Sequence, residues 1–310
     1  YGNLDQSRSA WYYLREAIGL AQSLGVDDAS SYVGLDAETQ QRRRRLFWLL
    51  FITERAYALQ HRRQVILRPS MELPKVFESQ DPKLIYGFVT LTKVFKTIDN
   101  EFISAWRQPP AGGARGSGQP CESMTKLLNQ EDVIGSLSLS EIDETQRLDV
   151  LVTQQWLRVL VCQMQVRQFL PHVHADAMDS AASHYDNRRI HEQYVLDISK
   201  NLLGIISKAN PVSLEAHGIG MEQKISDAAN CLCDFLTGLG VNDLNDTGFF
   251  CVPDLLHNFM MFLSGFRGRE SQYLEPLAQK ATTVLAARIR PSFPLMIMDE
   301  ADEAPLEIEN

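Results

Sequence analysis

The sequence predicts an all-α protein, an irregular bundle of about eight or nine helices. Apolar residues recur at steps of three or four along most of the chain, which is the spacing of a helix with one buried face. Alternating strand patterns joined by Asn-Gly or Asp-Gly turns do not occur. With 310 residues, 45% of them hydrophobic, the chain is long and apolar enough to bury a sizeable core.

Two helices are expected in the first part of the chain. The first ends at Gly25, a residue suited to the left-handed conformation of a helix C-cap. The second has Asp36 as its N-cap and runs to about Gln60. Its run 46–51 leaves almost no polar side, so we expect this helix to be central and buried on most faces. An extended segment at 64–69 follows it. The apolar positions of the first helix are Trp11, Leu14, Ala17, Ile18, Ala21 and Leu24.

The third expected helix has the most regular apolar pattern, a single stripe that runs from Leu84 to Trp106. The composition then changes, because residues 108–120 are rich in Pro, Gly, Ala and Ser, which indicates a flexible surface loop. We expect one helical domain over 1–298 and an acidic tail over 299–310. Further helices are expected at about 141–170, 185–209, 222–239, 253–266 and 272–289.

Charge, hydropathy and cysteine content exclude several classes of protein. The net charge is −9, whereas a nucleic-acid-binding surface normally carries a basic excess, so we do not expect this chain itself to hold DNA. The longest apolar stretch, 46–52, is too short to span a membrane, and a secretory signal is not visible. The five cysteines lack zinc-type spacing, which indicates free thiols in a reducing compartment. Because the chain begins at Tyr1, we expect it to be part of a longer soluble protein.

Three stretches near the N-terminus form an ordered set of motifs. They are Ala10–Ala21 (AWYYLREAIGLA) followed by Leu24-Gly25, Arg43–Phe51 (RRRLFWLLF), and Arg63–Leu67 leading to Leu73-Pro74. Taken in this order, they resemble the middle region of fungal zinc-cluster transcription factors, most closely the branch of amylase and maltose regulators. The third stretch departs from the family, whose commoner Gly-Arg-Pro is replaced here by Arg62-Arg63-Gln64.

The resemblance implies a regulatory domain of a transcription activator and no enzymatic activity. It implies that a binuclear zinc cluster lies upstream of Tyr1, so that DNA and zinc are bound only by that module and this chain needs no cofactor. The implied partners are a small-molecule effector, such as a sugar, or a coregulator protein, and the resemblance also allows a homodimer. The implied location is the nucleus, with shuttling to the cytoplasm.

Five residues around the second helix combine the chemistry that a sugar site needs. A sugar is bound by a flat aromatic ring together with several fixed polar groups. The alternative interpretation is that these side chains serve only in packing and ion pairs. The candidate ligand-binding residues are Trp48, Glu54, Arg55, Tyr57 and His61.

Other motifs carry weaker hypotheses. The run Arg42–Arg45 could bind nucleic acid, but such a run is more often paired with carboxylates such as Glu38 or Glu54. His172, His174 and Asp176 alternate, which does not place them on one helical face for a metal. The alternative function is a helical metal- or diphosphate-dependent enzyme, suggested only by the acidic stretch 243–246, which lacks a second acidic cluster. We therefore predict neither catalytic residues nor a metal site.

Overall fold

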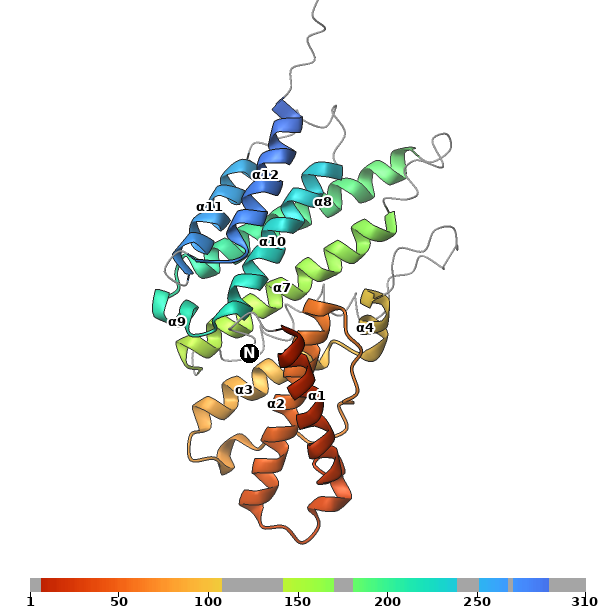
Figure 1. The fold of residues 1–310 in the computed structure, drawn as a ribbon, viewed down its shortest axis with the longest axis vertical. Helices are drawn as coiled ribbons and strands as arrows, with labels where there is room; N and C mark the ends of the chain where they lie inside the picture. The colour runs from red at the N-terminus through yellow and green to blue at the C-terminus, as the bar shows by residue number, and fades with distance from the viewer. Residues whose placement is uncertain (1–6, 108–141, 170–180, 239–250, 267–269, 290–310) are drawn as a thin grey trace, which may run out of the picture.

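The computed structural model describes residues 7–107, 142–169, 181–238, 251–266 and 270–289, and all regular structure in these ranges is helical (Figure 1). The all-α prediction is confirmed. The loop expected at 108–120, the acidic tail at 299–310, the alternating histidines near 172 and the acidic stretch at 243–246 lie outside the described residues. Within the described ranges, no helix is both long and apolar enough to cross a membrane.

The described part of the chain contains ten α-helices and two short 3-10 helices, η2 and η3. Several end at residues that the sequence indicates. Asp36 caps the second α-helix by accepting a hydrogen bond from the Thr39 amide at 2.9 Å, and Gly25 has the expected positive φ of 67°. The elements are α1 Ser7–Ser23, η2 Ala29–Tyr32, α2 Ala37–His61, η3 Val76–Glu78, α3 Pro82–Lys96, α4 Asn100–Arg107, α7 Glu144–Phe169, α8 Ala181–Ile206, α9 Pro211–Glu215, α10 Ile219–Gly238, α11 Val252–Gly265 and α12 Leu274–Ile289.

The third expected helix is divided into α3 and α4, which is a correction to the sequence analysis. The side chain of Asp99 accepts a hydrogen bond from the Phe102 amide at 2.7 Å, as an N-cap does, and so starts a new helix. Ile98 and Phe102 are still fully buried across the break, so the apolar stripe continues where the helix does not. Leu84, at the other end of the stripe, is 50% exposed because it lies in the first turn of α3.

Two hydrophobic cores share helix α7. The first is formed by α1 to α4 with one side of α7, and the second by α8 to α12 with the other side. Figure 1 shows α7 running between these two groups of helices. Every residue from Val152 to Cys162 is buried, so α7 is covered on all sides for about three turns.

Helix α2 is less buried than the sequence predicts. Leu46 and Leu49 are 42% and 53% exposed, whereas Leu50 is 8% exposed and Phe51 is fully buried. The reason is that α1 packs on one side of α2, and the segment that follows α2 packs on another. The hydrogen bonds of Glu54 hold both in place. The third side of α2 keeps its leucines although no described element covers them. An apolar run within a helix therefore overstates its burial.

The neighbouring leucines of α2 provide a matched test of this arrangement. We expect Leu50→Ala to lower the free energy of unfolding by about 2–4 kcal/mol, because it opens a cavity between α1 and α2. Leu49→Ala should cost less than about 1 kcal/mol, since its side chain is half exposed. Chemical denaturation of the two variants checks the prediction, and equal losses would contradict the assigned burial.

Gly87 of α3 packs closely against the start of α7. A Cβ at this position would meet Oε1 of Gln146 and lie 3.0 Å from Cγ2 of Ile142, whereas a Cβ at Gly19 of α1 would meet nothing within 4 Å. We expect Gly87→Ala to destabilise the protein by about 1–3 kcal/mol, because Gln146 must move and lose its hydrogen bond to the Leu84 carbonyl. The control Gly19→Ala should be neutral or stabilise by up to about 1 kcal/mol. Thermal melts in which both variants behave alike would contradict close packing of α3 on α7.

Candidate functional site

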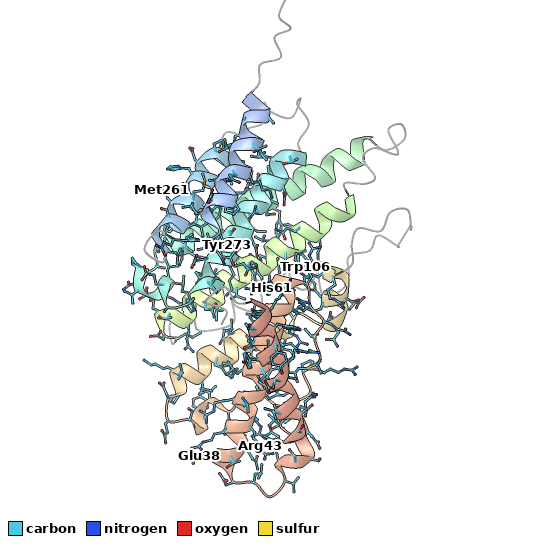
Figure 2. The ribbon with its side chains drawn as sticks, in the orientation of Figure 1. Glu38, Arg43, His61, Trp106, Met261 and Tyr273 are labelled. Atoms are coloured by element: carbon cyan, nitrogen blue, oxygen red, sulfur yellow. The ribbon has the colours of Figure 1, made fainter. Side chains whose placement is uncertain are left out.

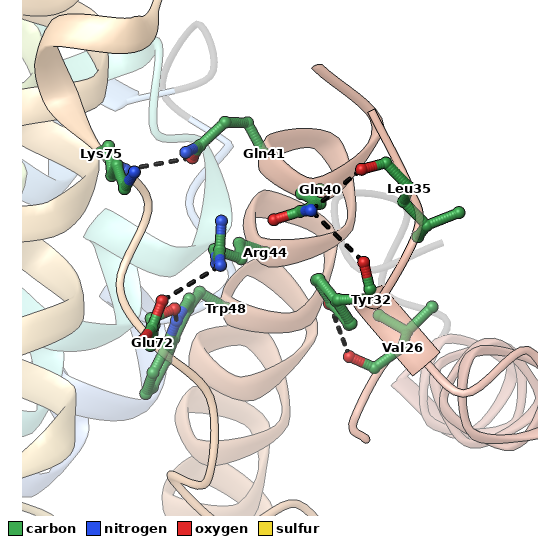
Figure 3. A network of polar contacts seen from close by, with 9 residues as sticks. All are labelled: Val26, Tyr32, Leu35, Gln40, Gln41, Arg44, Trp48, Glu72 and Lys75. Carbon is green, nitrogen blue, oxygen red and sulfur yellow. Dashed lines mark hydrogen bonds and ion pairs between the residues drawn. The ribbon is translucent and has the colours of Figure 1, made fainter. Parts of the chain in front are cut away.

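Trp48 lies on the inner side of α2 and is fully buried. Its Nε1 donates a hydrogen bond to the Glu72 carbonyl at 2.9 Å (Figure 3). Its ring makes edge contacts with Phe47 and Phe51. The ring thus holds the extended segment against α2. Because both its polar atom and its faces are covered, Trp48 packs the core instead of offering a surface on which a sugar could stack.

Glu54 connects three parts of the chain from a fully buried position on α2. Its carboxylate accepts a hydrogen bond from Nη1 of Arg15 at 2.9 Å and from the backbone amides of Ile66 and Leu67 at 2.8 and 2.9 Å. A buried carboxylate is stable only when hydrogen bonds and opposite charge replace its lost hydration. Glu54 therefore fixes both α1 and the segment after α2 in place.

Arg55, the next residue on α2, is also fully buried. Its Nε donates to the Ile98 carbonyl at 3.0 Å and its Nη1 to the Leu67 carbonyl at 3.1 Å, while the guanidinium lies 3.5 Å from the centre of the Phe51 ring. Burial lowers the pKa of Arg55 to about 10, and the nearby carboxylates of Glu54 and Asp99 oppose this shift. The group still carries its charge at neutral pH.

Tyr57 and His61 lie farther along α2 and are more accessible. Tyr57 is half-buried and its ring stacks on Trp11 of α1 at 5.9 Å between centroids, while His61 is exposed and lies 4.6 Å from the Tyr57 ring. Arg15 lies 5.3 Å from the Trp11 ring and joins this group to Glu54. Burial raises the pKa of the Tyr57 phenol, and burial together with Arg63 lowers the pKa of His61, which favours its neutral form.

The five predicted residues therefore form two groups on one helix. Trp48, Glu54 and Arg55 stabilise the core, while Tyr57 and His61 form an aromatic group at the C-terminal end of α2. We call this group, with Trp11, the α2 aromatic cluster. The sequence places Trp11 in an apolar stripe, and Arg15 is not among the predicted ligand-binding residues. The only feature of the sequence that connects Trp11 and Arg15 is their separation by one helical turn, which places an arginine beside an indole. Ligand binding at these residues stays a prediction.

The run Arg42–Arg45 is engaged in contacts within the chain. Arg42 pairs with Glu38, Arg44 pairs with Glu72 at 3.0 Å, and Arg43 donates to the Leu24 carbonyl at 3.4 Å (Figure 3 shows the Arg44 pair). The expected partner Glu38 is confirmed, whereas Glu54 pairs with Arg15 instead.

In the described ranges, no group of three or more His, Cys, Asp or Glu side chains is placed to hold a metal ion. The buried environment raises the pKa of Cys231 well above that of a free thiol.

We expect Glu54→Gln to lower the free energy of unfolding by about 2–4 kcal/mol, because an amide has one acceptor oxygen where the carboxylate serves Arg15 and two backbone amides. The matched control is Glu38→Gln on the same helix. Its ion pair with Arg42 is exposed, so the change should cost no more than about 0.5 kcal/mol. Urea denaturation measures both values, and a Glu54→Gln loss as small as that of the control would contradict the role of Glu54.

Comparison with curated proteins finds relatives with about a quarter of their aligned residues identical. The probable sucrose utilization protein SUC1 of Candida albicans is 24% identical over 237 residues, 75% of this chain and 43% of that protein. The maltose fermentation regulatory proteins MAL13 and MAL33 of Saccharomyces cerevisiae are 24% and 26% identical over 240 and 234 residues. These alignments cover 76% and 74% of this chain and 46% and 45% of the relatives. The chain thus spans less than half the length of these proteins.

No solved structure matches the chain. A family model does match it, over residues 1–160, and its description is the fungal specific transcription factor domain. The matched range contains nearly all of the first core and α7 as far as Leu160. Because the match covers just over half of the 310 residues, this chain belongs to the fungal specific transcription factor domain family.

Proposed function

We propose that this chain is the regulatory region of a fungal transcription activator for sugar utilisation. The observation that carries the proposal is the family match over residues 1–160, and the names of the relatives, which concern maltose and sucrose, supply the sugar class. In this proposal the chain has no enzymatic activity of its own. It controls a zinc-cluster DNA-binding module that precedes it in the whole protein, and it acts in the nucleus.

The proposed trigger is a sugar effector or a docked coregulator protein. An effector changes a regulator only when it binds one arrangement of the protein more tightly than another. The two cores that share α7 supply a physical basis, since a change on one side of α7 alters a packing surface of the other core. The α2 aromatic cluster is one place where a ligand could bias this packing, because Tyr57 and His61 are accessible and Arg15 links them to Glu54.

A reporter assay tests the regulatory role. The chain is fused behind a zinc-cluster DNA-binding module of known half-site and expressed in yeast with a matching reporter gene. We expect reporter activity to depend on maltose or sucrose in the medium, relative to the DNA-binding module alone. Sugar-independent activity that changes when a copurifying protein is deleted would assign the coregulator version. A fused chain that leaves the reporter unchanged under all conditions would refute the proposal.

We further expect the isolated chain not to bind duplex DNA with sequence preference. Its net charge is −9, and Arg42 and Arg44 of its basic run are already paired with Glu38 and Glu72. Electrophoretic mobility shifts at moderate salt check this, with the chain fused to the zinc-cluster module as the positive control. A discrete shift for one sequence over a scrambled one by the chain alone would contradict the assignment of DNA binding to another module.

A further inference from the structure

Helix α10 has a half-buried polar face. Gln223, Asp227 and Asn230 follow one another at steps of four and three, so they lie on one side of the helix. All three are half-buried, while Ala228, Ala229 and Leu232 on the other sides are fully buried. We call these three residues the α10 strip.

Helices on both sides border the α10 strip. On one side, Nε1 of Trp156 from α7 donates to Oδ2 of Asp227 at 2.8 Å, and Nε2 of Gln163 reaches the Asp227 carbonyl at 3.5 Å. On the other side, the hydroxyl of Tyr273, just before α12, donates to Oε1 of Gln223 at 3.4 Å. Figure 1 shows α10 running between α7 and α12, and Figure 2 labels Tyr273 in this region. The strip thus lies between the contacts that α10 makes with α7 and with the residue before α12.

Asp227 is the unusual member of the strip. In the described ranges its carboxylate accepts one hydrogen bond, from Trp156, and forms no ion pair. Two lysines on α10 and α12 are engaged elsewhere, because Lys224 pairs with Asp149 at 2.7 Å and Lys280 pairs with Asp234 at 2.7 Å. Burial raises the pKa of Asp227 to about 6, against the opposing effect of the Trp156 hydrogen bond. Asp227 is only half-buried, so the acceptor capacity of its carboxylate that no described residue uses is open to a donor from a ligand.

The groups around Asp227 indicate which ligand would complete it. Nδ2 of Asn230 donates to the Ser226 carbonyl of the same helix at 3.0 Å. Side-chain amides both donate and accept hydrogen bonds, so the remaining capacity of Gln223, Asn230 and Gln163 matches the hydroxyl groups of a sugar. A carboxylate can accept from two adjacent hydroxyls at once. A metal ion is a poor fit, since no group of three acidic, histidine or cysteine side chains occurs among the described residues. An anionic ligand would be repelled by Asp227.

We propose that the α10 strip, with Gln163 of α7, binds a neutral sugar through Asp227, whose carboxylate also accepts the hydrogen bond of the buried Trp156 indole. This inference rests on the proposed function and names the site at which the effector acts. Trp156 belongs to the first core and Asp227 lies on a helix of the second core, so the ligand would act where the two cores meet. The bound sugar therefore favours one packing of α7 against α10.

The decisive variant is Asp227→Asn in the full chain. Asparagine keeps an oxygen for the Trp156 indole but removes the charge. Since burial raises the pKa of Asp227, its contribution to stability is present below its ordinary pKa and is lost as pH rises through about 6. The variant should therefore melt at the same or a higher temperature than the wild type at pH 7.5. Asp197→Asn is the control, because Asp197 is an exposed acid on α8 that also accepts from one side chain, Gln193.

Binding is measured with maltose and sucrose at up to tens of millimolar, by thermal melts and by NMR of the indole N–H groups. We expect a saturable rise in Tm of about 2–3 °C at ten times Kd for the wild type and Asp197→Asn. We expect Asp227→Asn to weaken binding at least tenfold. Wild-type binding should weaken about tenfold at pH 5, where only about one carboxylate in ten is ionised. Magnesium chloride and a diamine serve as cationic probes.

The four tryptophans report the location of the ligand. Sugar should shift the indole signal of Trp156, while those of Trp48 and Trp106, bonded to the carbonyls of Glu72 and Leu59 in the first core, stay in place. A shift of Trp11 alone would place the effector at the α2 aromatic cluster, overturning this site but not the proposed function. Binding of a cationic probe without sugar binding would overturn the ligand class. Failure to bind either sugar, in a chain whose reporter fusion responds to sugar, would overturn the site.

Discussion

The complete burial of the middle of helix α7 is the constraint on which the rest of the structure depends. From Val152 to Cys162 no side of this helix faces solvent, so every polar side chain in these turns must find a partner inside the protein or lose its hydration uncompensated. The first core needs one side of α7 and the second core needs another. Neither group of helices can therefore be completed without the same three turns of backbone.

This constraint explains why charged and polar contacts connect α7 to α10. Asp149 and Thr153 both bind Nζ of Lys224 at 2.7 Å, and Trp156 one turn later binds Asp227. Burial raises the pKa of both carboxylates. At Asp149 it is outweighed by the charges of Lys224 and His217 together with hydrogen bonds from Lys224 and Thr153, which hold that pKa below its usual range. Asp227 has no such cation and keeps a raised pKa. The two carboxylates lie in similar surroundings and differ in their partners. Stability accounts for the first contact, and in the second Asp227 satisfies the buried indole N–H of Trp156. What the second contact does not supply is a cation for the carboxylate of Asp227.

The sequence predicts those features that depend on neighbouring residues. Gly25 and Asp36 end and begin helices because local backbone conformation and a side-chain cap suffice to place them. The break at Asp99 is not evident in the sequence because the apolar stripe keeps its period across it, and the cap competes with the helix at a single residue. Of the candidate site, the sequence indicates the chemistry of Glu54 and Arg55. It does not indicate their burial, since that depends on where residues 66, 67 and 98 return to α2.

The α10 strip is not evident in the sequence either. One aspartate among several charged residues of a helix forms no motif, and its partner Trp156 is 71 residues away. The family model ends at residue 160, within α7, so it contains Trp156 but not Asp227. The pairing of these two residues joins the matched part of the chain to the part beyond it. A ligand-dependent change at this contact would therefore pass directly into the first core, whose packing surface is α7 itself.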